Sequence, residues 1–214
     1  MSINVVTYHY VREIKKSKYP NIKGLEFTEF KNKINYLIKN YEIISTEDLI
    51  NKDFNSKKKN LILTFDDGLM DHYKYVYPFL KKKNISGSFY PAVESSLHKT
   101  ILYVHKLQFI LEKVQDRKLL LSKILKMVKL KGINVDYYLE IQKDLTKAND
   151  LRFNDNITNI IRNLLQYILP LKISSSIGNQ LFKKYVSINN KNFMKELYLS
   201  EKNIKEMIEN KMHF

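Results

Sequence analysis

Two adjacent carboxylates, Asp66 and Asp67, stand directly before Gly68 in the stretch "LTFDDG" at residues 63–68. Such a pair can divide acid–base work, with one carboxylate ionised on a cation and the other free to accept a proton. The same tripeptide also suits the start of a helix, because aspartate caps helix N-termini and glycine adopts positive φ. Taken alone, the tripeptide favours the helix cap, so the surrounding elements must decide between the two interpretations.

The stretch that leads into the pair favours chemistry. Residues 60–65, "NLILTF", are almost continuously apolar, which is typical of a parallel strand buried on both faces. The carboxylates therefore stand at the carboxyl end of a strand, where α/β folds collect ligands and catalytic groups. Neighbouring strand residues normally point apart, but a glycine directly after them lets the backbone bend. We expect both side chains to reach one cleft and to titrate as a coupled pair.

The elements around the pair alternate between strand and helix in residues 1–95. Strands are expected in "INVVTYHY", "YEIIS", "NLILTF" and "ISGSFYP". Helices are expected over residues 28–40 with Thr28 as the cap, over "TEDLI" with Ser45 or Thr46 as the cap, and over about 69–82. Pro78 falls inside the last of these and predicts a kink or break. This order predicts an α/β fold whose parallel sheet is a barrel or an open sheet.

The second half of the chain has a different pattern. Residues 98–210 carry helical periodicities and no clear strand, and Ser200 is placed to cap a last helix. We expect a large helical insertion over residues 96–198 between the strands of residues 1–95 and a return to the same fold over residues 199–214.

Composition and charge narrow the class of protein. The 214 residues include no Cys, which excludes a disulfide framework and a thiolate metal site. The net charge is +15, but Lys is dispersed along the chain, so we expect no specific nucleic-acid partner, although the charge could help to hold an anionic or lipid-linked sugar. No apolar stretch approaches the ~20 residues of a membrane helix and no secretory signal is seen, so a cytoplasmic location is expected.

The motif and its flanks resemble a known family. "LTFDDG", with "VVTYHYV" before it and "ISGSFYP" after it, resembles the first motif and neighbouring strands of the polysaccharide deacetylases, also called the NodB homology or carbohydrate esterase 4 family. The resemblance covers residues 1–95 and 199–214. The helical middle is similar to a longer form associated with surface-polysaccharide synthesis. The resemblance implies a partial, distorted (β/α) barrel of NodB type with a large helical insertion.

The same resemblance implies a reaction and a set of roles. The family hydrolyses N-acetyl, sometimes O-acetyl, groups on a sugar with a divalent metal, and zinc is expected. Asp66 would be the general base and Asp67 a metal ligand, while the metal would lower the pKa of its water from ~15.7 to roughly 7. The expected partner is an acetylated sugar, polysaccharide or lipid-linked glycan. His9, Tyr90 and Pro91 stand at strand ends and are candidates to contact that sugar, with ordinary packing as the alternative.

The family's other two metal ligands come from a His-x-x-x-His motif, whose spacing puts two imidazoles on one face of a helical turn. The five histidines of this chain are never four apart: His9, His72, His98, His105 and His213. The last residues, "LYLSEKNIKEMIENKMHF", resemble the family segment that leads into the motif. The resemblance therefore implies a chain that is truncated before its histidine ligands and inactive alone. The alternative is a non-catalytic sugar-binding or scaffold protein of the same fold.

Overall fold

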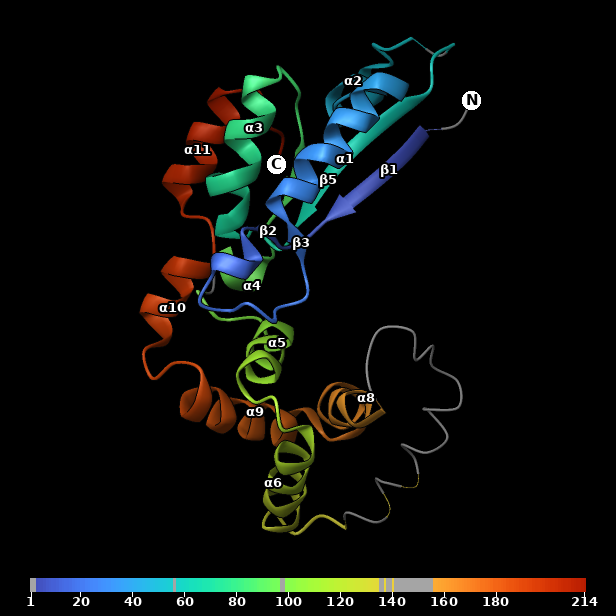
Figure 1. The fold of residues 1–214 in the computed structure, drawn as a ribbon. Helices are drawn as coiled ribbons and strands as arrows, with labels where there is room; N and C mark the ends of the chain where they lie inside the picture. Colours follow the sequence, from blue (N-terminus) through green and yellow to red (C-terminus); the bar gives the residue numbers. More distant parts are fainter. Residues whose placement is uncertain (1–2, 56, 97–98, 135–136, 138–139, 141–155) are drawn as a thin grey trace. The chain divides into compact units, whose positions relative to one another are not determined.

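The structure is a computed structural model that describes residues 3–55, 57–96, 99–134, 137, 140 and 156–214. The chain forms two compact units (Figure 1). The first unit contains Met1–Ile101 and Lys191–Phe214, and the second contains Leu102–Asn190. No helix within the described residues is both long enough and apolar enough to cross a membrane.

A parallel sheet forms the centre of the first unit. Its middle strand is β5 (Asn60–Asp66), and β1 (Ile3–Tyr8) pairs with β5 along one edge. The short strands β4 (Glu42–Ile43) and β6 (Ser88–Tyr90) pair with the beginning and the end of β5. This arrangement confirms the predicted α/β fold with a parallel sheet. Within the described residues the sheet is open, so closure into a barrel stays a prediction.

The core of the first unit is built on β5, as its apolar run predicts. Every residue of β5 except the last is buried, and the Phe65 ring stacks on Tyr8 and Phe89 at centroid distances of 5.4 and 4.7 Å. Burying one such side chain contributes roughly 1.5–3 kcal/mol. The cluster also includes residues of β5 itself and of the elements packed around it: Val11, Phe30, Ile34, Leu61, Leu63, Val76, Tyr77, Leu80, Met207 and Met212.

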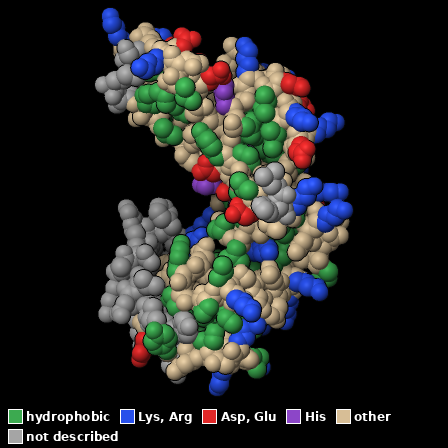
Figure 2. Space-filling view, turned by 180° about the vertical axis from the view of Figure 1, so that it is seen from behind, with side chains coloured by type: hydrophobic (Ala, Val, Ile, Leu, Met, Phe, Trp, Pro, Cys, Tyr) green, Lys and Arg blue, Asp and Glu red, His purple; other side chains and the backbone are tan. Residues whose placement is uncertain are grey.

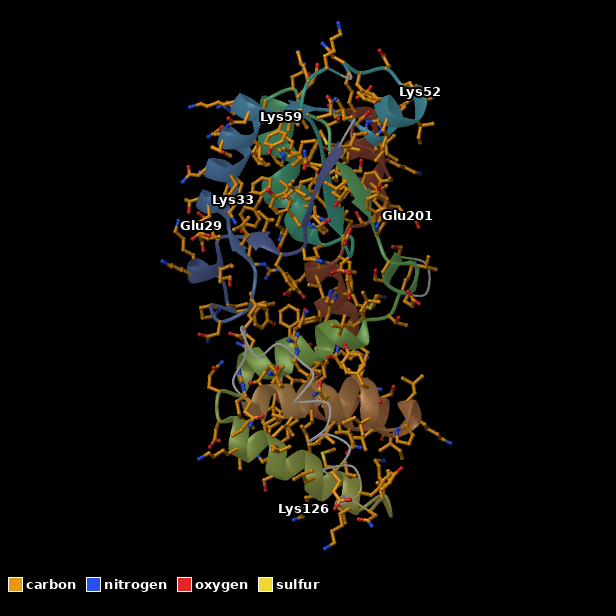
Figure 3. All side chains as sticks on the ribbon, turned by 90° about the vertical axis from the view of Figure 1, so that its right-hand side faces the viewer. Glu29, Lys33, Lys52, Lys59, Lys126 and Glu201 are labelled. Atoms are coloured by element: carbon orange, nitrogen blue, oxygen red, sulfur yellow. The ribbon has the colours of Figure 1, made fainter. Side chains whose placement is uncertain are left out.

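Helix α1 (Phe27–Asn40) covers this core with one face. Phe30 and Ile34 are fully buried, while Glu29 and Lys33 lie one turn apart on the exposed side (Figure 3). The expected cap at Thr28 is wrong, because the N-cap residue is Glu26 and the chain becomes helical at Phe27. The physical reason is a pairing between strands, described next, that holds the chain extended up to Glu26.

A small second sheet precedes α1. The strands β2 (Val11–Arg12) and β3 (Leu25–Glu26) pair in parallel, which the sequence pattern does not predict. The Glu26 carboxylate accepts a hydrogen bond from the backbone N–H of Ile14 at 3.0 Å. It therefore does not cap the N-terminus of α1, although Glu26 is the N-cap residue. These contacts attach the segment after β1 to the start of α1.

Helix α2 (Thr46–Asn51) begins with a capping box. The Ser45 hydroxyl accepts the N–H of Asp48 at 2.9 Å, and the Asp48 carboxylate accepts the N–H of Ser45 at 2.7 Å. Of the two caps that the sequence leaves open, the structure selects Ser45.

The helix after the carboxylate pair is interrupted, as Pro78 predicts. A π-helical turn, η2 (His72–Val76), leads into α3 (Tyr77–Lys82), and the N–H of Tyr77 donates to the carbonyl of His72 five residues earlier. Proline has no N–H for the carbonyl four residues before it, and a wider turn accommodates that loss. The interruption is therefore a π-turn just before Pro78, and the helix continues beyond it.

The last residues of the chain return to the first unit. Helix α10 (Asn190–Leu197) is followed by α11 (Glu201–Glu209), and Ser200 caps α11 as predicted. Helices α11 and α3 lie side by side (Figure 1), and the hydroxyl of Tyr73, in the π-turn η2 before α3, donates to Glu206 of α11 at 2.7 Å.

Three backbone hydrogen bonds complete this return. The N–H of His213 donates to the carbonyl of Gly87, and the N–H of Phe89 donates to the carbonyl of His213, at 3.0 and 2.7 Å. Leu199 donates its N–H to the carbonyl of Gly68 at 2.8 Å. The C-terminal residues thus extend the sheet beside β6 and also touch the turn that follows β5.

The regular elements described in the second unit are all helical. They are α5 (Tyr103–Lys113), α6 (Arg117–Lys129), α8 (Asn156–Asn163), the π-turn η4 (Leu164–Ile168) and α9 (Leu171–Tyr185). Tyr103 packs so closely on α9 that a Cβ at Gly178 would lie 2.5 Å from its ring. The unit has its own apolar interior, which includes Leu107, Ile110, Leu120, Ile124, Ile161, Leu164, Ile177, Leu181 and Phe182.

Basic side chains are dispersed over the surface. Exposed lysines come from separate parts of the chain, such as Lys52, Lys59 and Lys126 (Figure 3). Figure 2 shows Lys and Arg at several separate places on the face that it draws.

Candidate active site

The turn after β5 has an unusual backbone. Asp66 is the last residue of β5, and the next two residues, Asp67 and Gly68, have φ values of 72° and 60°. The left-handed conformation costs most non-glycine residues about 1–2 kcal/mol, although aspartate and asparagine adopt it more readily than other residues. Such strain is concentrated at functional sites, where the surrounding structure maintains it.

Gly68 is required by its surroundings as well as by its φ angle. A Cβ at this position would lie 2.6 Å from the Cβ of Pro91 and 2.9 Å from its Cα. Pro91 directly follows β6, so the close approach packs the ends of two neighbouring strands against each other. The turn is thereby held by its neighbours in the shape that its sequence permits.

His9 lies beside both carboxylates. Its Nδ1 is 2.9 Å from Oδ2 of Asp67, and its Nε2 is 3.9 Å from Oδ2 of Asp66. His9 follows the end of β1, and the carboxyl ends of parallel strands meet at one edge of the sheet. The side chains are 55% exposed for His9, 37% for Asp66 and 24% for Asp67. The surface in Figure 2 also shows histidine next to acidic side chains. The three groups are accessible to a substrate and to a cation.

The other two predicted contacts lie at the same edge. Tyr90 is the residue of β6 that pairs with Asp66, and it is 48% exposed. Pro91 is half-buried against Gly68. The structure therefore brings all five predicted site residues together at the carboxyl end of the sheet.

Sequence reasoning missed the part that His72 plays in this site. His72 is fully buried, and its Nε2 is 2.9 Å from the backbone carbonyl of His9. Its ring packs against Phe65 and Phe89 at centroid distances of 5.5 and 5.7 Å. Burial lowers the pKa of His72 to about 4, so the imidazole is neutral at physiological pH. A polar residue on the buried face of a helix was the signal in the sequence.

A buried ion pair, also missed, lies next to His72. Arg12 Nε donates to Oδ2 of Asp71 at 2.7 Å, and both side chains are almost inaccessible. Burial raises the pKa of Asp71 above its ordinary value, and the Arg12 guanidinium opposes that shift. The guanidinium also lies over the Tyr10 ring, 5.2 Å from its centroid. The partners are 59 residues apart, so no local pattern could have paired them.

A catalytic zinc usually takes three protein ligands and leaves one position open. Within the described part of the chain, no group of three or more His, Asp or Glu side chains is arranged to hold a metal ion. The carboxylate of Asp67 suits one position, because metal-bound carboxylates are commonly hydrogen-bonded by a neighbour such as His9. The described residues therefore fit one part of a metal site and do not fit the whole ligand set.

The sequence model of the polysaccharide deacetylase family matches residues 53–130, which include β5, the carboxylate pair and α3. Residues 53–130 are thus similar to the polysaccharide deacetylase family. This match supports the family resemblance that "LTFDDG" and its flanks indicate. No curated protein matches the chain.

Several solved structures are similar to parts of this chain. A de-N-acetylase from Aggregatibacter actinomycetemcomitans is 25% identical, over 47% of this chain and 42% of that one, with a TM-score of 0.38. IcaB from Ammonifex degensii is 22% identical, over 45% and 43%, with a TM-score of 0.35. The Streptococcus pyogenes deacetylase PplD, in complex with acetate, is 20% identical, over 52% and 51%, with a TM-score of 0.39. The chain spans about half or less of the length of these structures.

Proposed function

We propose that this chain carries the carboxylate part of a metal-dependent carbohydrate deacetylase, which hydrolyses N-acetyl or O-acetyl groups on a sugar. The observation that carries the proposal is the strained turn at the carboxyl end of β5, where Asp66 and Asp67 share one accessible edge with His9. The family match includes this turn.

The two carboxylates are proposed to have different roles. Asp66 is the general base, because its side chain is the more exposed of the two and can reach a water molecule at the edge of the sheet. Asp67 is the metal ligand, and its contact with His9 Nδ1 fixes the orientation of its carboxylate. A bound divalent cation, with zinc expected, would supply Lewis-acid activation of the acetyl carbonyl. The remaining ligands are proposed to lie outside the described residues.

The hydrolysis needs one proton acceptor and later one proton donor. Water adds its oxygen to the acetyl carbonyl carbon as Asp66 takes a proton, and the C–N or C–O bond then breaks. The leaving amine or alcohol receives a proton, and acetate is the second product. The proposed substrate is an acetylated sugar, polysaccharide or lipid-linked glycan. The exposed ring of Tyr90, with His9 and Pro91, is proposed to contact it.

A second candidate is a sugar-binding or scaffold protein that has this fold and no catalysis. The observation in its favour is that the described residues hold no three-ligand metal cluster. The two candidates differ in whether Asp66 matters for turnover or only for the shape of a binding surface.

The deciding experiment measures acetate released from N-acetylglucosamine oligomers and from an O-acetylated sugar polymer, with Zn²⁺ or Co²⁺ added to the full chain. We expect Asp66→Asn to lower acetate release by about 10²–10⁴-fold, the usual contribution of a general base. The matched control is Asp53→Asn, an exposed aspartate of the same unit. Acetate release that survives Asp66→Asn contradicts the proposal. Sugar binding without acetate release from any variant supports the second candidate.

A further inference from the structure

His72 is an unexpected residue for its position. It is fully buried against the stacked rings of Phe65 and Phe89, where an apolar ring would pack without losing contacts to water. Its Nδ1 is buried and has no hydrogen-bond partner among the residues that the structure describes. Among the described residues, the hydrogen bond of Nε2 with the backbone carbonyl of His9 is therefore the contact that explains a histidine at this position.

That contact has a definite direction. The backbone carbonyl of His9 can only accept, so the hydrogen lies on Nε2 of His72, which donates at 2.9 Å. Burial keeps the ring neutral, so a single tautomer and a single donor remain. The donor holds the backbone of His9 and leaves the His9 side chain free for the carboxylates.

The residue before His72 holds the same segment further along. The Asp71 carboxylate accepts from Arg12 Nε at 2.7 Å and also from the backbone N–H of Val11. Asp71 and His72 stand where the helix enters the π-turn η2. π-turns inside helices are frequent at functional sites. Two successive side chains thus fasten both ends of residues 9–12.

We propose that Asp71 and His72, which we call the clamp, are positioning residues that hold the His9 ring across both carboxylates of the site. In this arrangement His9 Nδ1–H donates to Asp67, and Nε2 faces Asp66. The catalytic consequence rests on the proposed deacetylase function. The arrangement of the His9 ring does not depend on that function. It can be detected by spectroscopy in protein that catalyses no reaction.

The first test is the tautomer of His9 in the full chain, from long-range ¹H–¹⁵N spectra of its imidazole at mildly alkaline pH, where an ordinary histidine is neutral. The wild-type ring is expected as Nδ1–H. His72→Phe keeps an aromatic ring and removes the donor, so His9 is expected to shift toward Nε2–H, the form that histidine prefers in water. His72→Gln keeps a side-chain N–H and is expected to restore much of the Nδ1–H signal.

The matched control is Thr7→Val. It removes the 2.9 Å hydrogen bond between the hydroxyls of Thr7 and Thr64, two residues from His9 on the same segment, and leaves the clamp intact. It is expected to leave the His9 signals unchanged. If His72→Phe does not fold, Asp71→Asn is the second variant, since it weakens the ion pair with Arg12 and is expected to produce the same shift.

In active protein, His72→Phe is expected to lower kcat about 10–100-fold with little change in KM, and His72→Gln to recover part of it. An unchanged His9 tautomer in His72→Phe overturns the clamp, and so does an equal shift in Thr7→Val, because general loosening then explains both. The two proposals can also fail separately. If only the clamp variants shift the His9 tautomer and no protein releases acetate, the result contradicts the deacetylase proposal and supports the clamp.

Discussion

Two aspartates that follow parallel strands of the same sheet differ sharply in what their carboxylates do. Asp48, soon after β4, accepts the N–H of Ser45 three residues earlier and completes a capping box. Asp67, after β5, has left-handed backbone and contacts His9, 58 residues earlier. The first carboxylate is satisfied within its own turn. The second stands in a strained turn that other strands hold in place.

The difference shows which carboxylates deserve a chemical interpretation. A capping carboxylate stabilises the helix that it starts, and local spacing is enough to predict it. A carboxylate that caps no helix, in a left-handed turn and exposed beside a second carboxylate and a histidine, calls for another explanation, and strained turns cluster at functional sites. We therefore expect changes at the capping turn to affect the free energy of unfolding, and changes at Asp67 to affect metal affinity.

The largest change in stability is expected for Gly68→Ala. The alanine would be left-handed and its Cβ would meet Pro91 at 2.6 Å, so the free energy of unfolding should fall by about 2–4 kcal/mol. Gly132→Ala is the control, because Gly132 is also left-handed, at φ 76°, but has open space around it and should lose only about 1 kcal/mol. Equal losses in urea denaturation would show that the contact with Pro91 does not constrain the turn.

Ser45→Ala tests the capping turn. Loss of the cap should lower the free energy of unfolding by about 1 kcal/mol and leave acetate release unchanged. Ser200→Ala, in the equivalent capping box of α11, should lose a similar amount. A fall in activity with Ser45→Ala would break the distinction between the two turns.

Asp67→Asn should lower metal affinity and leave the free energy of unfolding almost unchanged. Asparagine tolerates the left-handed conformation and can still accept from His9, so the free energy of unfolding should change by no more than about 0.5 kcal/mol. Metal affinity, measured by titration calorimetry with Zn²⁺, should fall at least about tenfold. A large loss of stability with unchanged metal affinity would make Asp67 a structural residue like Asp48.

The smallest effect is the pH dependence of the capping turn. Hydrogen bonds from Ser45 lower the pKa of Asp48, so the carboxylate contributes stability above its unfolded pKa of about 3.9 and loses it as pH falls through the lower folded value. The stability difference between wild type and Asp48→Asn should therefore shrink from about pH 6 to about pH 3. Guanidinium denaturation at several pH values measures it, and a difference that grows on acidification would contradict this sign.

Sequence patterns predicted those features whose causes are local. The apolar run of residues 60–65 is enough for a buried parallel strand, and Pro78 for an interruption in the next helix. Ser200 as a cap follows in the same way, from a hydroxyl placed just before a helical pattern. The position of Asp66 at the end of a strand follows from the same run. Each of these depends on residues within one or two turns of the chain.

Other features needed the folded chain. The cap at Thr28 failed because β2 and β3 pair and keep the chain extended up to Glu26. Neither the ion pair of Arg12 with Asp71 nor the donor from His72 to His9 leaves a trace in local spacing, since the partners are 59 and 63 residues apart.

The sequence by itself determined that two carboxylates and a glycine end a buried strand, because side-chain type and period are properties of neighbours along the chain. Only the tertiary structure decided that His9 lies against that pair and that Asp71 and His72 hold it there. The physical reason is that parallel strands bring residues from distant segments to one edge, and hydrogen bonds formed there select one arrangement of their side chains.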